Sequence, residues 1–167
     1  MTWRELIEAE IKNTYDVTDR LLSRVDDRDL GWQPTGGGNW MTTGQLLFHL
    51  GSACGAPMRG FVTGEWGFPE GEIAELPPAD GLPTVASVAE AKRLLCEDRR
   101  AAVESLAACG DEDLSNKAAP APWDPTPLVL GNRLLQMVDH LKQHKGQLFY
   151  YLKLQGRPVS TPDLWGV

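Results

Sequence analysis

The sequence predicts an all-α protein, a four-helix bundle with a long crossover between its second and third helices. Apolar residues recur at three- and four-residue spacing along four segments, and each segment opens with a helix-start signal. A stretch rich in Gly and Pro, about residues 64–86, separates the second segment from the third. So long a connection inside one domain is accounted for by a crossover, which is an established bundle topology.

The first two helices each open with a capping box. Thr2 precedes Glu5 by three positions, and the helix behind them is predicted to reach about residue 27. Thr42 and Gln45 form the same pattern at the start of the second helix. That helix is predicted to continue for about 20 residues, with a kink at Pro57 because proline lacks a backbone N–H.

The last two helices have equally clear signals. Ser87 and Glu90 open a helix that is predicted to end at Gly110. The fourth helix has Pro127 at its first position and is predicted to run to Gln155, followed by a capping glycine and a proline.

We expect one domain over residues 1–158 and a C-terminal tail over residues 159–167. The tail carries Leu164 and Trp165, which could dock on the bundle or on a second subunit. Both alternatives are open at this point.

Composition excludes several classes of function. A net charge of −7 and an isoelectric point near 4.9 argue against binding nucleic acids or anionic membranes. No apolar run approaches the roughly 18 residues that span a bilayer. The cysteines, Cys54, Cys96 and Cys109, are odd in number and form no Cys-x-x-Cys, which favours reduced thiols and a cytoplasmic protein.

The chain has only three histidines. His140 and His144 are four residues apart in the fourth predicted helix and therefore share a face, beside its apolar arc. His49 lies in the second helix and could complete a three-histidine metal site with an open coordination position. The alternative is that His49 is an ordinary core histidine and that His140 and His144 are two polar residues on the surface. The small residues near His49 could equally leave room for a cavity or permit close packing.

Other metal and nucleophile chemistries lack their signatures. The segment from His140 to His144 has no glutamate of the His-Glu-x-x-His type, and no Glu-x-x-His occurs. No phosphate-binding glycine loop and no catalytic-triad signature is present. These absences argue against a zinc peptidase, a di-iron bundle and a nucleotide-binding protein.

Three segments resemble the DinB-like family of metal-binding four-helix bundles. Residues 139–158 carry the family's His-x-x-x-His-x-Gly-Gln, a later Tyr-Leu and a terminal Gly. Residues 44–50 contain its Leu-x-His-Leu stretch, and residues 31–34 resemble its tryptophan-proline turn before the second helix.

The resemblance implies that His49, His140 and His144 hold one divalent ion, in a bundle that is often a homodimer in this family. Imidazole ligands suit Zn, Ni, Fe or Mn. Characterised relatives use the metal to activate a low-molecular-weight thiol, such as mycothiol or bacillithiol, for transfer or isomerisation. Others resemble metal-dependent hydrolases.

The leading hypothesis is therefore a metal-dependent thiol S-transferase that acts on a small-molecule substrate. The alternatives are a metal-dependent hydrolase and a non-enzymatic metal- or ligand-binding stress-response protein. No catalytic residue is assigned. Arg133, Gln147 and Tyr151 are predicted to bind substrate: Arg133 could orient an anionic group, and Gln147 could bond either a ligand or a ligating imidazole. Each could instead be a core-edge residue.

Overall fold

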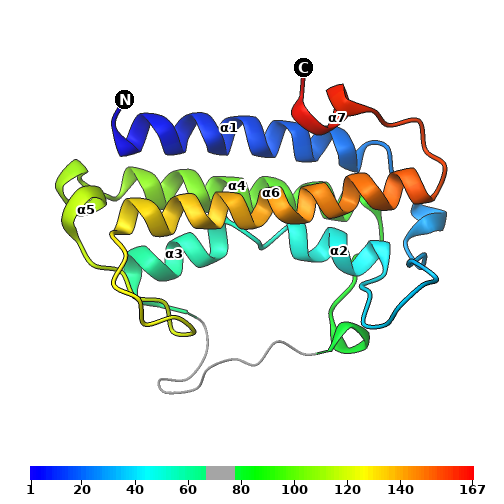
Figure 1. Ribbon diagram of the computed structural model, residues 1–167, viewed down its shortest axis with the longest axis horizontal. Coiled ribbons are helices and arrows are strands. Elements are labelled where there is room, and N and C mark those ends of the chain that lie inside the picture. The colour runs from blue at the N-terminus through cyan, green and yellow to red at the C-terminus, as the bar shows by residue number, and fades with distance from the viewer. Residues whose placement is uncertain (67–77) are drawn as a thin grey trace.

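The structure, a computed structural model, describes residues 1–66 and 78–167. Four long segments form a bundle: α1 (Trp3–Leu22), α2 (Thr43–Leu50) followed by α3 (Gly55–Thr63), α4 (Val88–Ala107) and α6 (Leu130–Leu154) (Figure 1). The short elements are η1 (Asp27–Asp29), η2 (Ala79–Gly81), α5 (Asp111–Asn116) and α7 (Thr161–Trp165). The described residues contain isolated bridges but no strand, so the all-α prediction is confirmed.

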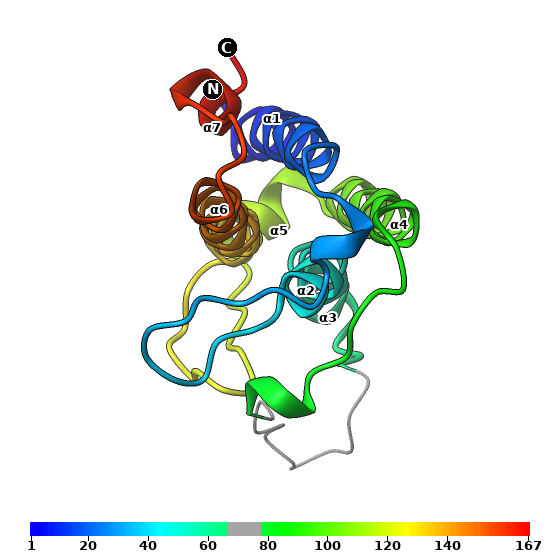
Figure 2. The same cartoon turned by 90° about the vertical axis from the view of Figure 1, so that its right-hand side faces the viewer.

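The directions of the helices require the predicted crossover. α1 and α6 run from left to right in Figure 1, whereas α2, α3 and α4 run from right to left. The connection from Thr63 to Val88 must therefore return along the length of the bundle; residues 67–77 of it lie outside the described part of the chain. α2 and α3 follow one another along the bundle in Figure 1, and together they form one side of it, between α4 and α6 (Figure 2).

The capping signals act as predicted at the first two helices, and helix ends differ from the prediction. The boxes at Thr2 and at Thr42 form in full. At the third predicted box Ser87 accepts from the Glu90 backbone N–H, but the Glu90 carboxylate accepts from the Ala86 N–H rather than from that of Ser87. The first helix ends at Leu22, five residues before the predicted end, and the fourth begins at Leu130 rather than at Pro127. Residues 126–129 stay extended because Val129 pairs with Ala118 in an antiparallel bridge, a tertiary contact that helix signals do not report.

The second predicted helix is broken rather than kinked. α2 ends at Leu50 and α3 begins at Gly55, so Pro57 lies in the first turn of a new helix, where its missing N–H is tolerated. A Cβ at Gly51 would lie 2.6 Å from Leu94 Cβ, and one at Gly55 would lie 1.9 Å from a backbone oxygen of α4. Glycine at both positions thus lets the broken segment pack directly on α4.

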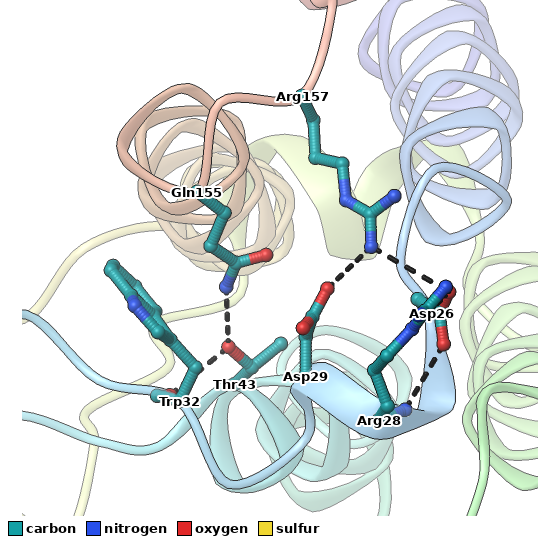
Figure 3. Close-up of polar contacts among 7 residues, drawn as sticks. All are labelled: Asp26, Arg28, Asp29, Trp32, Thr43, Gln155 and Arg157. Carbon is teal, nitrogen blue, oxygen red and sulfur yellow. Dashed lines mark hydrogen bonds and ion pairs between the residues drawn. The ribbon is translucent and has the colours of Figure 1, made fainter.

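Polar contacts fasten the connection before α2 to the C-terminal end of α6 (Figure 3). The Arg157 guanidinium forms ion pairs with Asp29 and Asp26 of the η1 region. Gln155 donates from its amide to Thr43 Oγ1 at 3.0 Å, and that hydroxyl donates to the Trp32 carbonyl at 3.1 Å. The connection between α1 and α2 is therefore held against α6.

The C-terminal tail docks on the bundle of its own chain. α7 lies against α1 and α6, where Lys145 Nζ donates to the Leu164 carbonyl at 2.8 Å and Arg24 pairs with Asp163 at 3.2 Å. Trp165 is 63% exposed, so the docking is made by backbone and charged groups more than by this ring. Among the helices of the described residues, none has the length and apolar character needed to cross a membrane.

Candidate metal centre

Three imidazoles meet between α2 and α6. His49 lies in the last turn of α2, and His140 and His144 lie one turn apart on α6. The Nε2 atom of His140 is 3.2 Å from that of His49 and 3.1 Å from that of His144. All three side chains are half-buried, and one ligand nitrogen of each lies within 4.8 Å of the others. This group can hold a metal ion.

The break between α2 and α3 orients His140. Its Nδ1 lies 2.8 Å from the Ala53 carbonyl. A carbonyl only accepts, so Nδ1 carries the proton and Nε2 of the neutral ring presents a lone pair. In a continuous helix the Ala53 carbonyl would accept from residue 57, but Pro57 has no N–H to give. The proline thus leaves this oxygen free for the histidine.

A chain of side chains orients His144. Tyr151 Oη donates to the Met41 carbonyl at 2.9 Å, so the hydroxyl must accept from Gln147 Nε2, which is 3.2 Å away. This orientation turns Gln147 Oε1 toward His144 Nδ1, at 3.0 Å. His144 therefore also carries its proton on Nδ1 and presents a lone pair at Nε2.

The resulting geometry suits a cation. Two Nε2 lone pairs that face each other at 3.1 Å, on His140 and His144, repel unless a positive charge lies between them. Two nitrogens bound to one tetrahedral ion at about 2.0–2.1 Å lie about 3.3 Å apart, close to the observed separation. The donor set, its spacing and its protonation therefore fit a divalent ion.

The surroundings also keep the rings of His49 and His144 neutral, as metal ligation requires. Burial, together with the neighbouring rings of His144 and His140, lowers the pKa of His49 to about 4. Burial likewise lowers the pKa of His144, against a smaller opposite effect of its bond to Gln147. His49 and His144 are thus neutral at neutral pH, and the proton of His144 lies on Nδ1.

Aromatic rings lie on either side of the histidines along α6. Trp32 and Trp40 pack edge-on against Tyr151, with ring centroids at 5.3 Å and 6.4 Å. Toward the other end of α6, Phe61, Trp66 and Trp123 pack together at centroid distances of 4.8–6.1 Å.

Arg133 lies in a different setting from the histidines. It is 2% exposed, and its guanidinium sits over the Phe61 ring at 5.7 Å. All five of its N–H donors have acceptors within the chain, namely the carbonyls of Ala119, Asp124 and Thr126 and the side chains of Asp124 and Gln136. Arg133 therefore holds the connection between α5 and α6 in place. Its contact with a substrate stays a prediction, and each of its N–H groups already has an acceptor within the chain.

Of the other predicted substrate-binding residues, Gln147 contacts the His144 imidazole, and Tyr151 accepts a hydrogen bond from Gln147. A direct contact of either with a substrate stays a prediction. Cys54 is buried, and its thiol contacts Met58 Sδ at 3.7 Å and does not belong to the histidine group. Burial, with Asp98 nearby, raises the pKa of Cys54 to about 12.

Two backbone carbonyls were not anticipated from the sequence. Ala53 and Met41 accept the hydrogen bonds that fix the two histidines of α6. For Ala53 a signal existed, because a proline four residues later leaves a helical carbonyl without its donor. For Met41 none existed, because its position depends on how the connection before α2 folds back.

Comparisons with known proteins agree with this fold. The family model of the DinB superfamily matches residues 10–148. A DinB-like protein from Bacillus cereus ATCC 10987, known from a crystal structure, is similar over 93% of this chain and 95% of that one, with a TM-score of 0.68 and 20% sequence identity. A search of curated proteins gave no match. The family match covers most of the chain, including all three histidines, and the chain therefore belongs to the DinB superfamily.

Proposed function

We propose that the chain is a metal-dependent enzyme acting on small molecules, with one divalent ion held by His49, His140 and His144, and that its reaction is a thiol S-transfer. One observation carries the metal assignment: two imidazoles whose protons are fixed on Nδ1 face each other with their Nε2 lone pairs at 3.1 Å. When bound, a divalent ion supplies Lewis acidity that lowers the pKa of a thiol or water in the open position.

The charge of the site supports an anionic fourth ligand. The ligands are three neutral imidazoles, and the partners of His140 and His144 are a neutral carbonyl and a neutral amide. In the described part of the chain, no Asp, Glu or Cys joins the group that could hold the ion. Within the described residues no carboxylate or thiolate coordinates the ion, which favours a thiolate or a hydroxide as the additional ligand.

The lack of a carboxylate in this group favours a thiol over water. Hydrolysis calls for a general base that directs the attacking water, and a thiol, with an ordinary pKa near 8.5, loses its proton far more readily. In the transfer, the thiol sulfur forms a bond to an electrophilic carbon. The leaving group departs with the bonding electron pair, and the thiol proton passes to solvent.

A spectroscopic titration tests this proposal. The protein is stripped of metal, reconstituted with Co²⁺ and titrated with cysteine, mycothiol or bacillithiol, beside the S-methyl thioether of each as a matched control. We expect a sulfur-to-cobalt charge-transfer band with the thiols and none with the thioethers. One bound Co²⁺ without a thiol response would instead favour hydrolysis or ligand sensing. The homodimer and the cytoplasmic location stay predictions.

A further inference from the structure

A buried aspartate lies behind the histidine site. Asp98 of α4 is 5% exposed, and its carboxylate faces the first turn of α3. It accepts hydrogen bonds from the backbone N–H of Cys54 at 3.2 Å and of Ala56 at 2.9 Å, and from the Tyr15 hydroxyl at 2.7 Å. Burial raises the pKa of Tyr15, so this hydroxyl remains a donor.

One of these bonds involves the peptide group that orients His140. The N–H of Cys54 and the carbonyl of Ala53 belong to the same amide. Asp98 accepts from its N–H side, and its carbonyl side accepts from His140 Nδ1 at 2.8 Å. A continuous path of hydrogen bonds thus runs from a buried carboxylate, through one peptide, to a ring whose Nε2 faces the other histidines.

Such a path has an electronic consequence. A carboxylate that accepts from an amide N–H polarises the amide and makes its carbonyl a stronger acceptor, and linked hydrogen bonds strengthen one another by roughly 10–30%. Where a carboxylate bonds directly to a metal-ligating histidine, it fixes the tautomer and raises the basicity of the ligand. Here the same effect would pass through a peptide group.

We propose that Asp98 is a positioning residue of the metal centre, which acts on His140 through the Ala53–Cys54 peptide. The proposal rests on the proposed metal site but not on thiol transfer. It assigns to α4, which carries no ligand, a part in the strength of metal binding.

Two features of the sequence serve this path. Gly55 lets the start of α3 approach α4, since a Cβ there would lie 1.9 Å from the Asp98 backbone oxygen. Pro57 removes the helical donor that would otherwise compete for the Ala53 carbonyl. Ala53 and Cys54 are each at most 1% exposed, so water does not screen the path.

The competing explanation is that Asp98 only caps α3. Cys54 supplies no side-chain cap, and a carboxylate on two backbone N–H groups at a helix start is stabilising by itself. In that case its loss lowers the stability of the fold and leaves the metal affinity of the folded protein unchanged. The two explanations therefore differ in metal affinity.

The first test compares Asp98→Asn with Tyr15→Phe. Asparagine keeps the shape and removes the charge, whereas phenylalanine removes a hydrogen bond of the same cluster and leaves the path from Asp98 to His140 intact. Zn²⁺ affinity is measured by competition with a chromophoric chelator, on samples shown to be folded by circular dichroism. We expect a roughly 10–100-fold loss for Asp98→Asn and near wild-type affinity for Tyr15→Phe. Equal affinities in wild type and Asp98→Asn, or equal losses in both variants, would overturn the proposal.

A second test needs no variant and holds even if Asp98→Asn fails to fold. Amide spectra of the wild-type protein are recorded by nuclear magnetic resonance without metal and with Zn²⁺. Metal at His140 Nε2 makes Nδ1–H a stronger donor, so the Cys54 amide proton should shift downfield. The Ala56 amide is the internal control, because it also bonds Asp98 but belongs to another peptide. A Cys54 shift no larger than that of Ala56 would contradict the path.

The outcomes separate this inference from the proposed function. A wild-type protein that binds no Zn²⁺ refutes the metal site itself, before Asp98 is considered. A protein that binds Zn²⁺ with unchanged affinity in Asp98→Asn refutes only the role of Asp98. A thiol response has no bearing on either result.

Discussion

His140 and His144 lie one turn apart on the same helix, yet they are held in different ways. His144 depends on Gln147 and Tyr151, which follow it on α6, and only the last acceptor, the Met41 carbonyl, comes from elsewhere. His140 depends on a backbone carbonyl at the break between α2 and α3, behind which lies Asp98 of α4. One ligand is thus oriented mainly by its own helix and the other by the packing of the whole bundle.

The comparison shows how two neutral imidazoles of one helix can differ in strength as ligands. The chain of groups behind His144 contains an amide, a hydroxyl and a carbonyl, all uncharged. The chain behind His140 ends, on our proposal, in a carboxylate. We therefore expect changes behind His140 to weaken metal binding more than changes behind His144.

The largest effect is expected from removing a ligand. His144→Ala should abolish stoichiometric metal binding, because two imidazoles on different helices remain, while the helical content of the bundle is kept. Metal content is measured by elemental analysis and helicity by circular dichroism. Gln143→Ala, an exposed neighbour on α6, is the matched control and should retain the ion. Full metal retention in His144→Ala would remove the basis of the metal assignment.

A large effect of another kind is expected at Arg133. Arg133→Ala removes the five hydrogen bonds that hold the connection before α6 and leaves the Ala119 carbonyl without its donor, so we expect a loss of about 2–4 kcal/mol in the free energy of unfolding. Urea denaturation measures it, with the exposed Arg100→Ala as a control. Because both chains behind the histidines are untouched, metal affinity should stay the same. Lost substrate affinity at unchanged stability would restore the predicted substrate contact.

An intermediate effect is expected at Gln147. Gln147→Leu removes the acceptor of His144 Nδ1 with little change in size, and we expect about tenfold weaker metal affinity. Gln147→Glu keeps an acceptor at this place and serves as the comparison variant. Competition with a chelator gives both values. A loss in Gln147→Leu larger than that in Asp98→Asn would reverse the order that we expect for the two histidines.

No effect of metal is expected on the reactivity of the Cys54 thiol. The raised pKa, about 12, leaves its thiol protonated at neutral and mildly alkaline pH, and the side chain is buried. A thiol reagent at pH 8 should therefore modify the exposed Cys96 and leave Cys54 unmodified, with and without metal. Mass spectrometry of the labelled peptides measures this. Labelling of Cys54 that appears only after metal removal would indicate that its thiol is a further ligand.

The groups behind His144 and those behind His140 also differ in how far they could be predicted from the sequence. His140, His144 and Gln147 follow one another at helical spacing, so their common face could be predicted from α6 alone. The bundle and its crossover could be predicted from the four segments with helical spacing of apolar residues and the long connection between the second and the third. The Ala53 carbonyl and Asp98 could not, because they meet His140 only through contacts between helices. For the same reason Pro57 was expected to kink a helix that it helps to break.

Two short elements show the same limit. α5 and α7, of six and five residues, are too short to produce a helical pattern of apolar residues and are stabilised by their contacts with the bundle. Arg133 was correctly placed on the fourth helix, but four of the five hydrogen bonds that it donates go to residues 119–126, whose path no local signal gives.

The most direct test of the central claim is the metal stoichiometry of the wild-type protein by native mass spectrometry, as purified, after chelation and after reconstitution. We predict one divalent ion per chain, lost on chelation and restored by one equivalent of Zn, Ni, Fe or Mn. A chain that takes up no ion from any of these metals would contradict the account and leave a helical bundle with three clustered histidines.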